Sequence, residues 1–207
     1  DLTEKKPYLD KSLKNFDITL IFIFIFSIVI YSQEKTIIRI EKAEFFEKNE
    51  EKFPGASILS KGSSSRVLIS HDGAILKCDE AFFYEKKNFI EAYGNVSLNQ
   101  GDTITLNSNY LEYNGNNKLV FAKGDVILDE PESKLYTQSL SYDRNLQQAY
   151  YDKNGLMIRN GIDSIKSKTG TYFANKKRYD FKINVNLKSP KYIIAVSYTH
   201  LTLPTTK

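Results

Sequence analysis

Histidine and cysteine, the side chains that most often hold metals or move protons, number only two and one in this sequence. A His-dependent triad or a zinc site needs several such residues at defined spacings. His71 precedes Asp72-Gly73, a dipeptide typical of a tight turn, and His200 lies near the carboxyl terminus. Cys78 alone forms neither an internal disulfide nor a Cys-based cluster, and we interpret it as a buried thiol. The sequence therefore predicts no metal site.

Paired carboxylates are the next candidates for chemistry, because a glycosidase needs two of them flanking the bond that it cleaves. Asp79-Glu80 and Asp129-Glu130 are such pairs. Adjacent residues of a strand point to opposite faces, which favours solvated turns over a catalytic pair at both places. The sequence also lacks the Gly-x-x-x-x-Gly-Lys phosphate loop and the His-Glu-x-x-His zinc motif. We therefore predict no catalytic residue and no cofactor, and we expect that the protein is not an enzyme.

Basic residues are scattered among acidic ones, and the formal net charge is only +4. This balance gives no support to nucleic-acid binding. Two small clusters, Lys86-Lys87 and Lys176-Lys177-Arg178, fall near expected hairpin tips. Solubility and protection of strand edges are the favoured interpretation, and contact with lipid phosphates is the alternative.

The elements that position these residues form an internal repeat of about 30 residues. The matched pairs are Leu76 with Leu106, Cys78 with Ser108, Ala81 with Leu111, Phe83 with Tyr113, Ala92 with Ala122, Gly94 with Gly124, Val96 with Val126 and Leu98 with Leu128. A third unit carries Leu135 to Tyr142, a fourth carries Ile165 to Tyr172, and a looser copy opens the series near Ile38. Repeats of this length indicate stacked units that bury an apolar side together.

Alternation within each unit predicts strands, since Ile90, Ala92, Val96 and Leu98 share one face while polar residues occupy the other. The alternation slips by one position before Leu111, as expected where a strand turns a corner. Turn-forming residues separate the runs, at Asp72-Gly73, Gln100-Gly101-Asp102, Asn114-Gly115-Asn116-Asn117 and Asn154-Gly155.

These patterns predict an all-β fold of stacked strand units, either a closed right-handed β-helix or an open, folded-over jelly roll. Gly94 and Gly124 are expected to point inward in mid-strand. Glycine at such a position marks either a bend or a place where a ligand approaches the backbone, and both interpretations stay open here.

A hydrophobic helix is expected near the amino terminus, where Lys11 and Lys14 precede the apolar run 18–31. Its helical length of about 21 Å is shorter than a membrane core of about 30 Å. Residues 1–32 therefore fit a signal peptide cleaved after Ser32, with an uncleaved membrane anchor as the alternative. In both cases the rest of the chain is exported. Residues 196–207 resemble a translated sequencing adapter, and we set them aside as a non-native tail.

Several ordered motifs in the middle of the chain carry a family resemblance. They are His71-Asp72-Gly73-Ala74, Gly94-Asn95-Val96-Ser97-Leu98, Gln100-Gly101-Asp102-Thr103, Tyr110-Leu111-Glu112-Tyr113 and Gly124-Asp125-Val126-Ile127-Leu128. With them the chain resembles the OstA-like proteins, the family of LptA, and most of all the Bacteroidetes type. The resemblance runs from about Ile37 to about Ile194 within the expected domain 33–195, and it implies that the natural protein is longer.

The resemblance implies an open β-jelly-roll whose apolar trough shelters lipopolysaccharide acyl chains during export to the outer membrane. It implies a periplasmic location, with anchoring in the inner membrane if the amino-terminal segment is retained. The implied partners are lipopolysaccharide and other Lpt-type jelly-roll subunits, which pair end to end through their strands.

The lipid-binding groove that follows from this mapping consists of inward-facing residues. These are Leu76, Cys78, Ala81, Phe83, Ile90, Ala92, Val96, Leu98, Leu106, Leu111, Tyr113, Val120, Val126, Leu128, Leu135, Leu140, Tyr142 and Met157. For any one of them, ordinary core packing is the favoured interpretation, so the functional prediction belongs to the whole set. Two other functions stay open, a carbohydrate-active β-solenoid and a purely structural surface β-solenoid.

Overall fold

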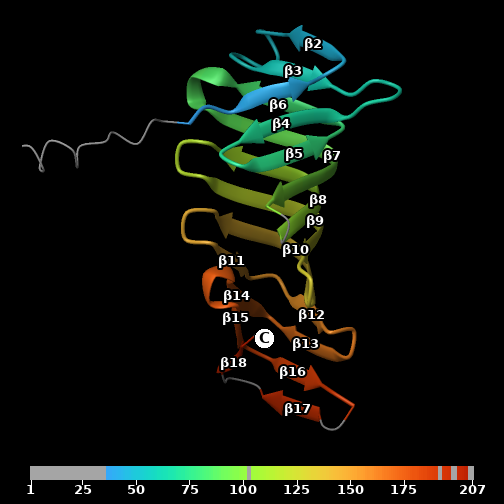
Figure 1. Cartoon of the computed structure of the whole chain (residues 1–207), viewed down its shortest axis with the longest axis vertical. Helices are drawn as coiled ribbons and strands as arrows, with labels where there is room; N and C mark the ends of the chain where they lie inside the picture. The colour runs from blue at the N-terminus through green and yellow to red at the C-terminus, as the bar shows by residue number, and fades with distance from the viewer. Residues whose placement is uncertain (1–35, 102–103, 191–192, 197–199, 205–207) are drawn as a thin grey trace, which may run out of the picture. The chain divides into compact units, whose positions relative to one another are not determined.

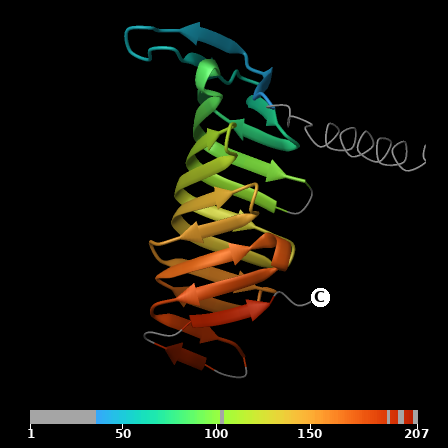
Figure 2. The same cartoon turned by 90° about the vertical axis from the view of Figure 1, so that its left-hand side faces the viewer.

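The computed structural model describes residues 36–101, 104–190, 193–196 and 200–204. Within them, all regular elements are strands apart from two short 3-10 turns, η1 (Glu85–Lys87) and η2 (Ala174–Lys176). The strands pair antiparallel in one 18-stranded sheet (Figures 1 and 2). The predicted all-β fold of stacked strand units is confirmed in these residues, and the expected amino-terminal helix lies outside them.

Four long strands form the centre of the sheet. They are β7 (Phe89–Gln100), β8 (Ile104–Asn114), β9 (Leu119–Asp129) and β10 (Ser133–Asp143). Each pairs with the next along the chain, and the register shifts near the middle of every pairing. Each long strand therefore turns a corner there and contributes one half to each side of a folded sheet.

The shorter strands extend these two sides. The first half-sheet adds β1 (Arg39–Lys42), β4 (Val67–His71), β5 (Ala74–Cys78), β12 (Gly155–Arg159), β13 (Asp163–Ser167), β16 (Val185–Lys188) and β17 (Ile193–Val196). The second half-sheet adds β2 (Phe45–Lys48), β3 (Ser57–Ser60), β6 (Glu80–Tyr84), β11 (Gln148–Tyr151), β14 (Thr169–Phe173), β15 (Arg178–Lys182) and β18 (His200–Pro204).

One apolar core lies between the two half-sheets. Along β5, Leu76 is 3% exposed whereas its neighbour Ile75 is 45% exposed, as the alternation predicts. The buried side chains of both half-sheets join in a single cluster that runs from Ile38 to Leu187. Burial of this shared interior is what holds the two halves against each other.

The corners are built by bulges. Gly94 and Asn95 of β7 lie opposite the single residue Asn109 of β8, and Gly124 and Asp125 of β9 lie opposite one residue of β10. All four of these β7 and β9 residues have positive φ, from 47° to 79°. Each two-against-one bulge bends the sheet at the corner. The bulged strands β7 and β9 keep their buried residues at even spacing, and the slip in alternation falls on the partner strands β8 and β10.

The expected inward orientation of the two corner glycines is wrong. A Cβ on Gly124 would lie 3.1 Å from the Cβ of Asn109, and one on Gly94 would lie 3.0 Å from the Cβ of Asp79. These neighbours belong to the corner and not to the apolar core, because Asn109 is exposed and Asp79 forms ion pairs at the surface. Between the two interpretations left open, the structure thus favours the bend.

Most of the predicted turns are confirmed. Asp72 and Gly73 join β4 to β5 with φ of 48° and 74°. The side chain of Asn114 accepts hydrogen bonds from the backbone of the turn that follows β8. At the other end of the chain, His200–Pro204 pairs with β15, so part of the segment set aside as a tail continues the sheet. The origin of that segment is not tested by this pairing.

Replacing Gly124 with Ala should lower the free energy of unfolding by more than Gly55→Ala does. Both glycines have positive φ (79° and 75°), a conformation that costs about 1–2 kcal/mol for an L side chain. Only at Gly124 does the added methyl group also crowd another residue. Denaturant titration of both variants measures the difference, and equal losses would show that the corner is not tightly packed.

Candidate functional site

The predicted groove residues all come together in the interior. All eighteen belong to the buried core, and the most exposed of them, Phe83, is 7% exposed. Leu98, Leu106 and Leu128 come from the first half-sheet, and Leu111 and Leu140 come from the second. The eighteen residues therefore belong to one apolar interior.

An accessible wall was expected, and the structure instead covers this wall with the protein's own atoms. The physical reason is that the two half-sheets pack directly on each other, so that large side chains such as Tyr142 and Met157 are 2% and 1% exposed. Cys78 lies in the same interior, where burial raises the pKa of its thiol to about 12. Contact of these residues with lipid stays a prediction.

Polar side chains meet at the edge of the fold opposite the corners, which we call the mouth. Here the turns of the first half-sheet, after β4, β7 and β9, face the turns of the second half-sheet, after β8 and β10. Two clusters of hydrogen bonds connect these turns across the mouth. Neither cluster belongs to the regular ladder of the sheet.

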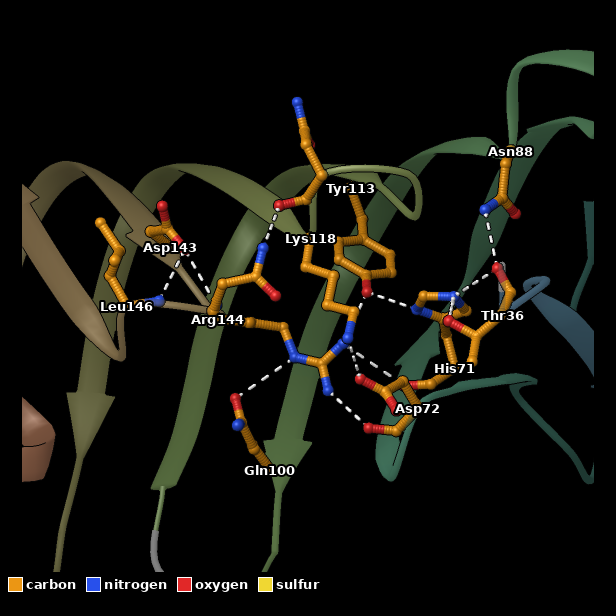
Figure 3. Close-up of polar contacts among 12 residues, drawn as sticks. Thr36, His71, Asp72, Asn88, Gln100, Tyr113, Lys118, Asp143, Arg144 and Leu146 are labelled. Carbon is orange, nitrogen blue, oxygen red and sulfur yellow. Dashed lines mark hydrogen bonds and ion pairs between the residues drawn. The ribbon is translucent and has the colours of Figure 1, made fainter. Parts of the chain in front are cut away.

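Arg144 is the centre of the first cluster (Figure 3). It follows β10 of the second half-sheet and is 6% exposed. Its Nη2 donates to the carbonyl of Asp72 at 2.8 Å, and its Nε donates to Oε1 of Gln100 at 3.3 Å, both on the first half-sheet. Its Nη1 donates to the hydroxyl of Tyr113 at 2.5 Å and to the carbonyl of His71 at 3.4 Å. One guanidinium thus joins both halves.

His71 extends this cluster toward the amino-terminal end of the described chain. Its Nδ1 lies 2.5 Å from the hydroxyl of Tyr113, and its Nε2 lies 2.9 Å from Oγ1 of Thr36. Burial is the main cause that lowers the pKa of His71, and the nearby charge of Arg144 lowers it further. A neutral ring protonated on Nε2 lets Tyr113 accept from Arg144 and donate to His71.

Two further contacts cross the mouth beside Arg144. Lys118, in the turn after β8, forms an ion pair with Asp72 at 2.6 Å. The hydrogen bond from Lys118 is the main cause that lowers the pKa of Asp72. The hydroxyl of Tyr142 donates to Oε1 of Gln100 at 3.2 Å. We call Arg144, His71, Tyr113, Gln100, Lys118, Asp72 and Tyr142 the Arg144 cluster.

Glu130 is the centre of the second cluster. It follows β9 and accepts hydrogen bonds at Oε2 from Ser133 and from Tyr179 of β15, both at 3.2 Å. Burial raises the pKa of Glu130, and hydrogen bonds from Tyr172, Ser133 and Tyr179 oppose that shift. The prediction of a freely solvated turn is therefore wrong for Glu130, whose carboxylate is half-buried against tyrosines.

The two acidic pairs singled out in the sequence lie at different edges of the fold. Asp79 lies at the corners, where it pairs with Lys61 at 2.8 Å and accepts from Asn95 at 2.8 Å. Glu130 lies at the mouth. Within the second pair, Asp129 forms a surface ion pair with Lys134 at 2.7 Å, whereas Glu130 accepts from Ser133 and Tyr179, so its two carboxylates are held by separate partners.

A cavity of about 340 Å³ opens at the mouth between the two clusters. Its lining includes Gln100 and Tyr142 of the Arg144 cluster and Glu130 of the second cluster. Ile104 and Ala174, which pack against the core, also line it. The cavity thus extends from a polar rim to the edge of the apolar interior.

The two basic clusters lie at hairpin tips, as predicted. Lys86 and Lys87 belong to η1, and Lys176 belongs to η2, which follow β6 and β14 of the second half-sheet. The Nζ of Lys87 lies 5.2 Å from the centre of the Tyr84 ring. These lysines are exposed, and their contact with lipid phosphates stays a prediction.

Sequence reasoning missed the Arg144 cluster and the role of Glu130. Across the described part of the chain, no three His, Cys, Asp or Glu side chains gather as a metal site. In that same part, no helix is long and apolar enough to cross a membrane.

Comparison with known proteins gives a family match over most of the chain. The sequence profile of the OstA-like proteins matches residues 35–197. Among solved structures, the chain is similar to LptH, the LptA homologous periplasmic component of the lipopolysaccharide transport device of Pseudomonas aeruginosa. The two share 17% identity with a TM-score of 0.44, over 48% of this chain and 75% of LptH. No curated protein matches the sequence.

Replacing Arg144 with Ala should lower the free energy of unfolding by about 2–3 kcal/mol, because it removes charged hydrogen bonds from buried acceptors. Lys134→Ala is the matched control. Lys134 is also a cation with a partner, since it pairs with Asp129 at 2.7 Å, but this ion pair lies on the surface. That variant should change stability little. Denaturant titration of both compares them, and similar losses would contradict the importance of the Arg144 cluster.

Replacing Glu130 with Gln should stabilise the protein near neutral pH. Because the pKa of Glu130 is raised from 4.5 by folding, its contribution to stability is present at low pH and is lost as the pH rises through the folded pKa. Gln keeps the hydrogen-bond acceptor and removes the buried charge. The gain in melting temperature should therefore be largest at pH 7–8 and disappear near pH 4. A gain that does not depend on pH would contradict this assignment.

Proposed function

The chain belongs to the OstA-like protein family, and from this premise we propose that it shelters the acyl chains of lipopolysaccharide during export across the periplasm to the outer membrane. The observation that carries the proposal is the continuous apolar interior, which collects side chains from both half-sheets along the whole stack. The proposed role is non-enzymatic. It requires an apolar surface and no catalytic group.

The energetics of such a role follow from the hydrophobic effect. An acyl chain of about twelve methylenes gains about 10 kcal/mol when it leaves water, at about 0.8 kcal/mol per methylene. In the closed structure the interior side chains cover one another. A bound chain would replace those contacts with its own, so opening of the two half-sheets and lipid binding are one coupled step.

The partners that we propose are further OstA-like jelly-roll subunits. Among the strands that the structure describes, β1 and β2 at one end of the sheet have a single partner strand each, and so do β17 and β18 at the other end. Unpaired strand edges of this kind accept another strand through main-chain hydrogen bonds. Pairing end to end would extend the apolar interior from one subunit to the next.

A purely structural role is the second candidate, because the packed interior is also what a structural β-solenoid requires. Cleavage of carbohydrate has no comparable support, since the carboxylates of Asp79 and Glu130 are each held by ion pairs or hydrogen bonds within the fold. Lipid capture by interior residues discriminates between the transport role and the structural role.

A diazirine amino acid placed at Leu98 or Leu140 should capture lipopolysaccharide on illumination. Both side chains are buried in the interior, at 4% and 1% exposure, and the small diazirine group preserves the packing. Mass analysis of the photoproduct identifies the captured lipid.

The matched control is the same amino acid at Leu119, which is 44% exposed on the outside of the sheet. Capture at the interior positions with little at Leu119 is the expected result. If the folded protein captures no lipid at either interior position, the structural role replaces the transport role.

A further inference from the structure

We propose that lipid enters this protein sideways through the mouth, and that the Arg144 cluster is a latch that must release before the interior can open. This inference rests on the proposed function and adds the route and the residues that control it. Three observations support it: the continuity of the corners, the position of the cross-mouth contacts and the cavity beside them.

The corners leave only one edge at which the two half-sheets can separate. The strands β7, β8, β9 and β10 pass through the corner without a break, and each belongs to both halves. Separation at that edge would require breaking the ladder between neighbouring long strands. At the mouth, by contrast, no described strand runs from one half to the other. The contacts there are made by side chains and turns, in addition to the packing of the shared interior.

The latch is concentrated on a few groups. Arg144 contributes one cation that bonds both halves, and the ion pair between Lys118 and Asp72 crosses the same gap. The hydroxyls of Tyr113 and Tyr142 also hold the turns after β4 and β7, through His71 and Gln100. Release of the two cations together with these two hydrogen bonds would free those turns from the second half-sheet. Lys118 and Asp72 are partly exposed, so water can replace their partners when they separate. Arg144 is 6% exposed and gains access to water only as the turns move apart.

The cavity lies where an acyl chain would first reach the interior. It opens between the Arg144 cluster and the Glu130 cluster, so this part of the mouth holds about 340 Å³ of space. Ile104 and Ala174 line it and also pack against the core, which gives an apolar path inward. Opening of the latch would widen this path beside the turns after β4, β7, β8 and β10, and the backbone pairing of the sheet would stay intact.

A covalent lock across the mouth tests the latch. Asp72→Cys and Lys118→Cys place two thiols at the ion pair, and a short bis-maleimide links them. The native Cys78 is buried with a thiol pKa of about 12, so it stays unmodified. The control link joins Asn109→Cys to Asp125→Cys, two corner residues whose side chains hydrogen-bond at 3.0 Å within the continuous ladder.

Uptake of fluorescent lipopolysaccharide is measured for the wild-type chain and for both linked proteins, with folding checked by circular dichroism. We expect uptake at least tenfold slower with the mouth linked, and a rate close to that of the wild type with the corner linked. Equal uptake by the two linked proteins overturns the latch while leaving the proposed function intact, because lipid would then enter by the ends of the stack. If the wild-type chain takes up no lipid at all, the proposed function itself fails.

Discussion

The structure depends on one geometric constraint: every long strand must keep its apolar side chains on the same side before and after it turns a corner. The bulges satisfy this constraint by placing two residues of β7 opposite a single residue of β8. As a result, Leu111 beyond the corner of β8 and Leu106 before it reach the same interior. Without the slip in β8, its half beyond the corner would turn its apolar side chains toward water.

The sequence predicted those features that depend on neighbouring residues. Alternation, the turn at Asp72-Gly73 and the slip before Leu111 are local patterns, and each of them survived in the fold. The Arg144 cluster was not predictable in this way, because its bonds join residues 31 to 73 positions apart. An arginine after a strand looks the same in sequence whether it is solvated or buried. Glu130 was missed for the same reason, since its partner Tyr179 lies 49 positions away.

Under the proposed function, the interior serves two purposes that compete with each other. A closely packed core stabilises the chain alone, whereas a lipid carrier needs that same surface to be available. The fold separates the two demands in space: the continuous strands hold the corner edge, and polar side chains such as Arg144 and Glu130 hold the mouth. Polar contacts are suited to the edge that is proposed to open, because water can form hydrogen bonds with the released groups. Apolar groups at that edge would have no such compensation when water reaches them.

The repeat of about 30 residues also makes the length of the molecule independent of its width. One repeat corresponds to two long strands, such as β7 and β8, and neighbouring strands lie about 4.8 Å apart. Duplication of one unit would therefore lengthen the molecule by about 10 Å and leave its width unchanged. Gene duplication can thus adjust the distance that such a protein spans in steps of one hairpin. Each added hairpin keeps the same corner and the same width.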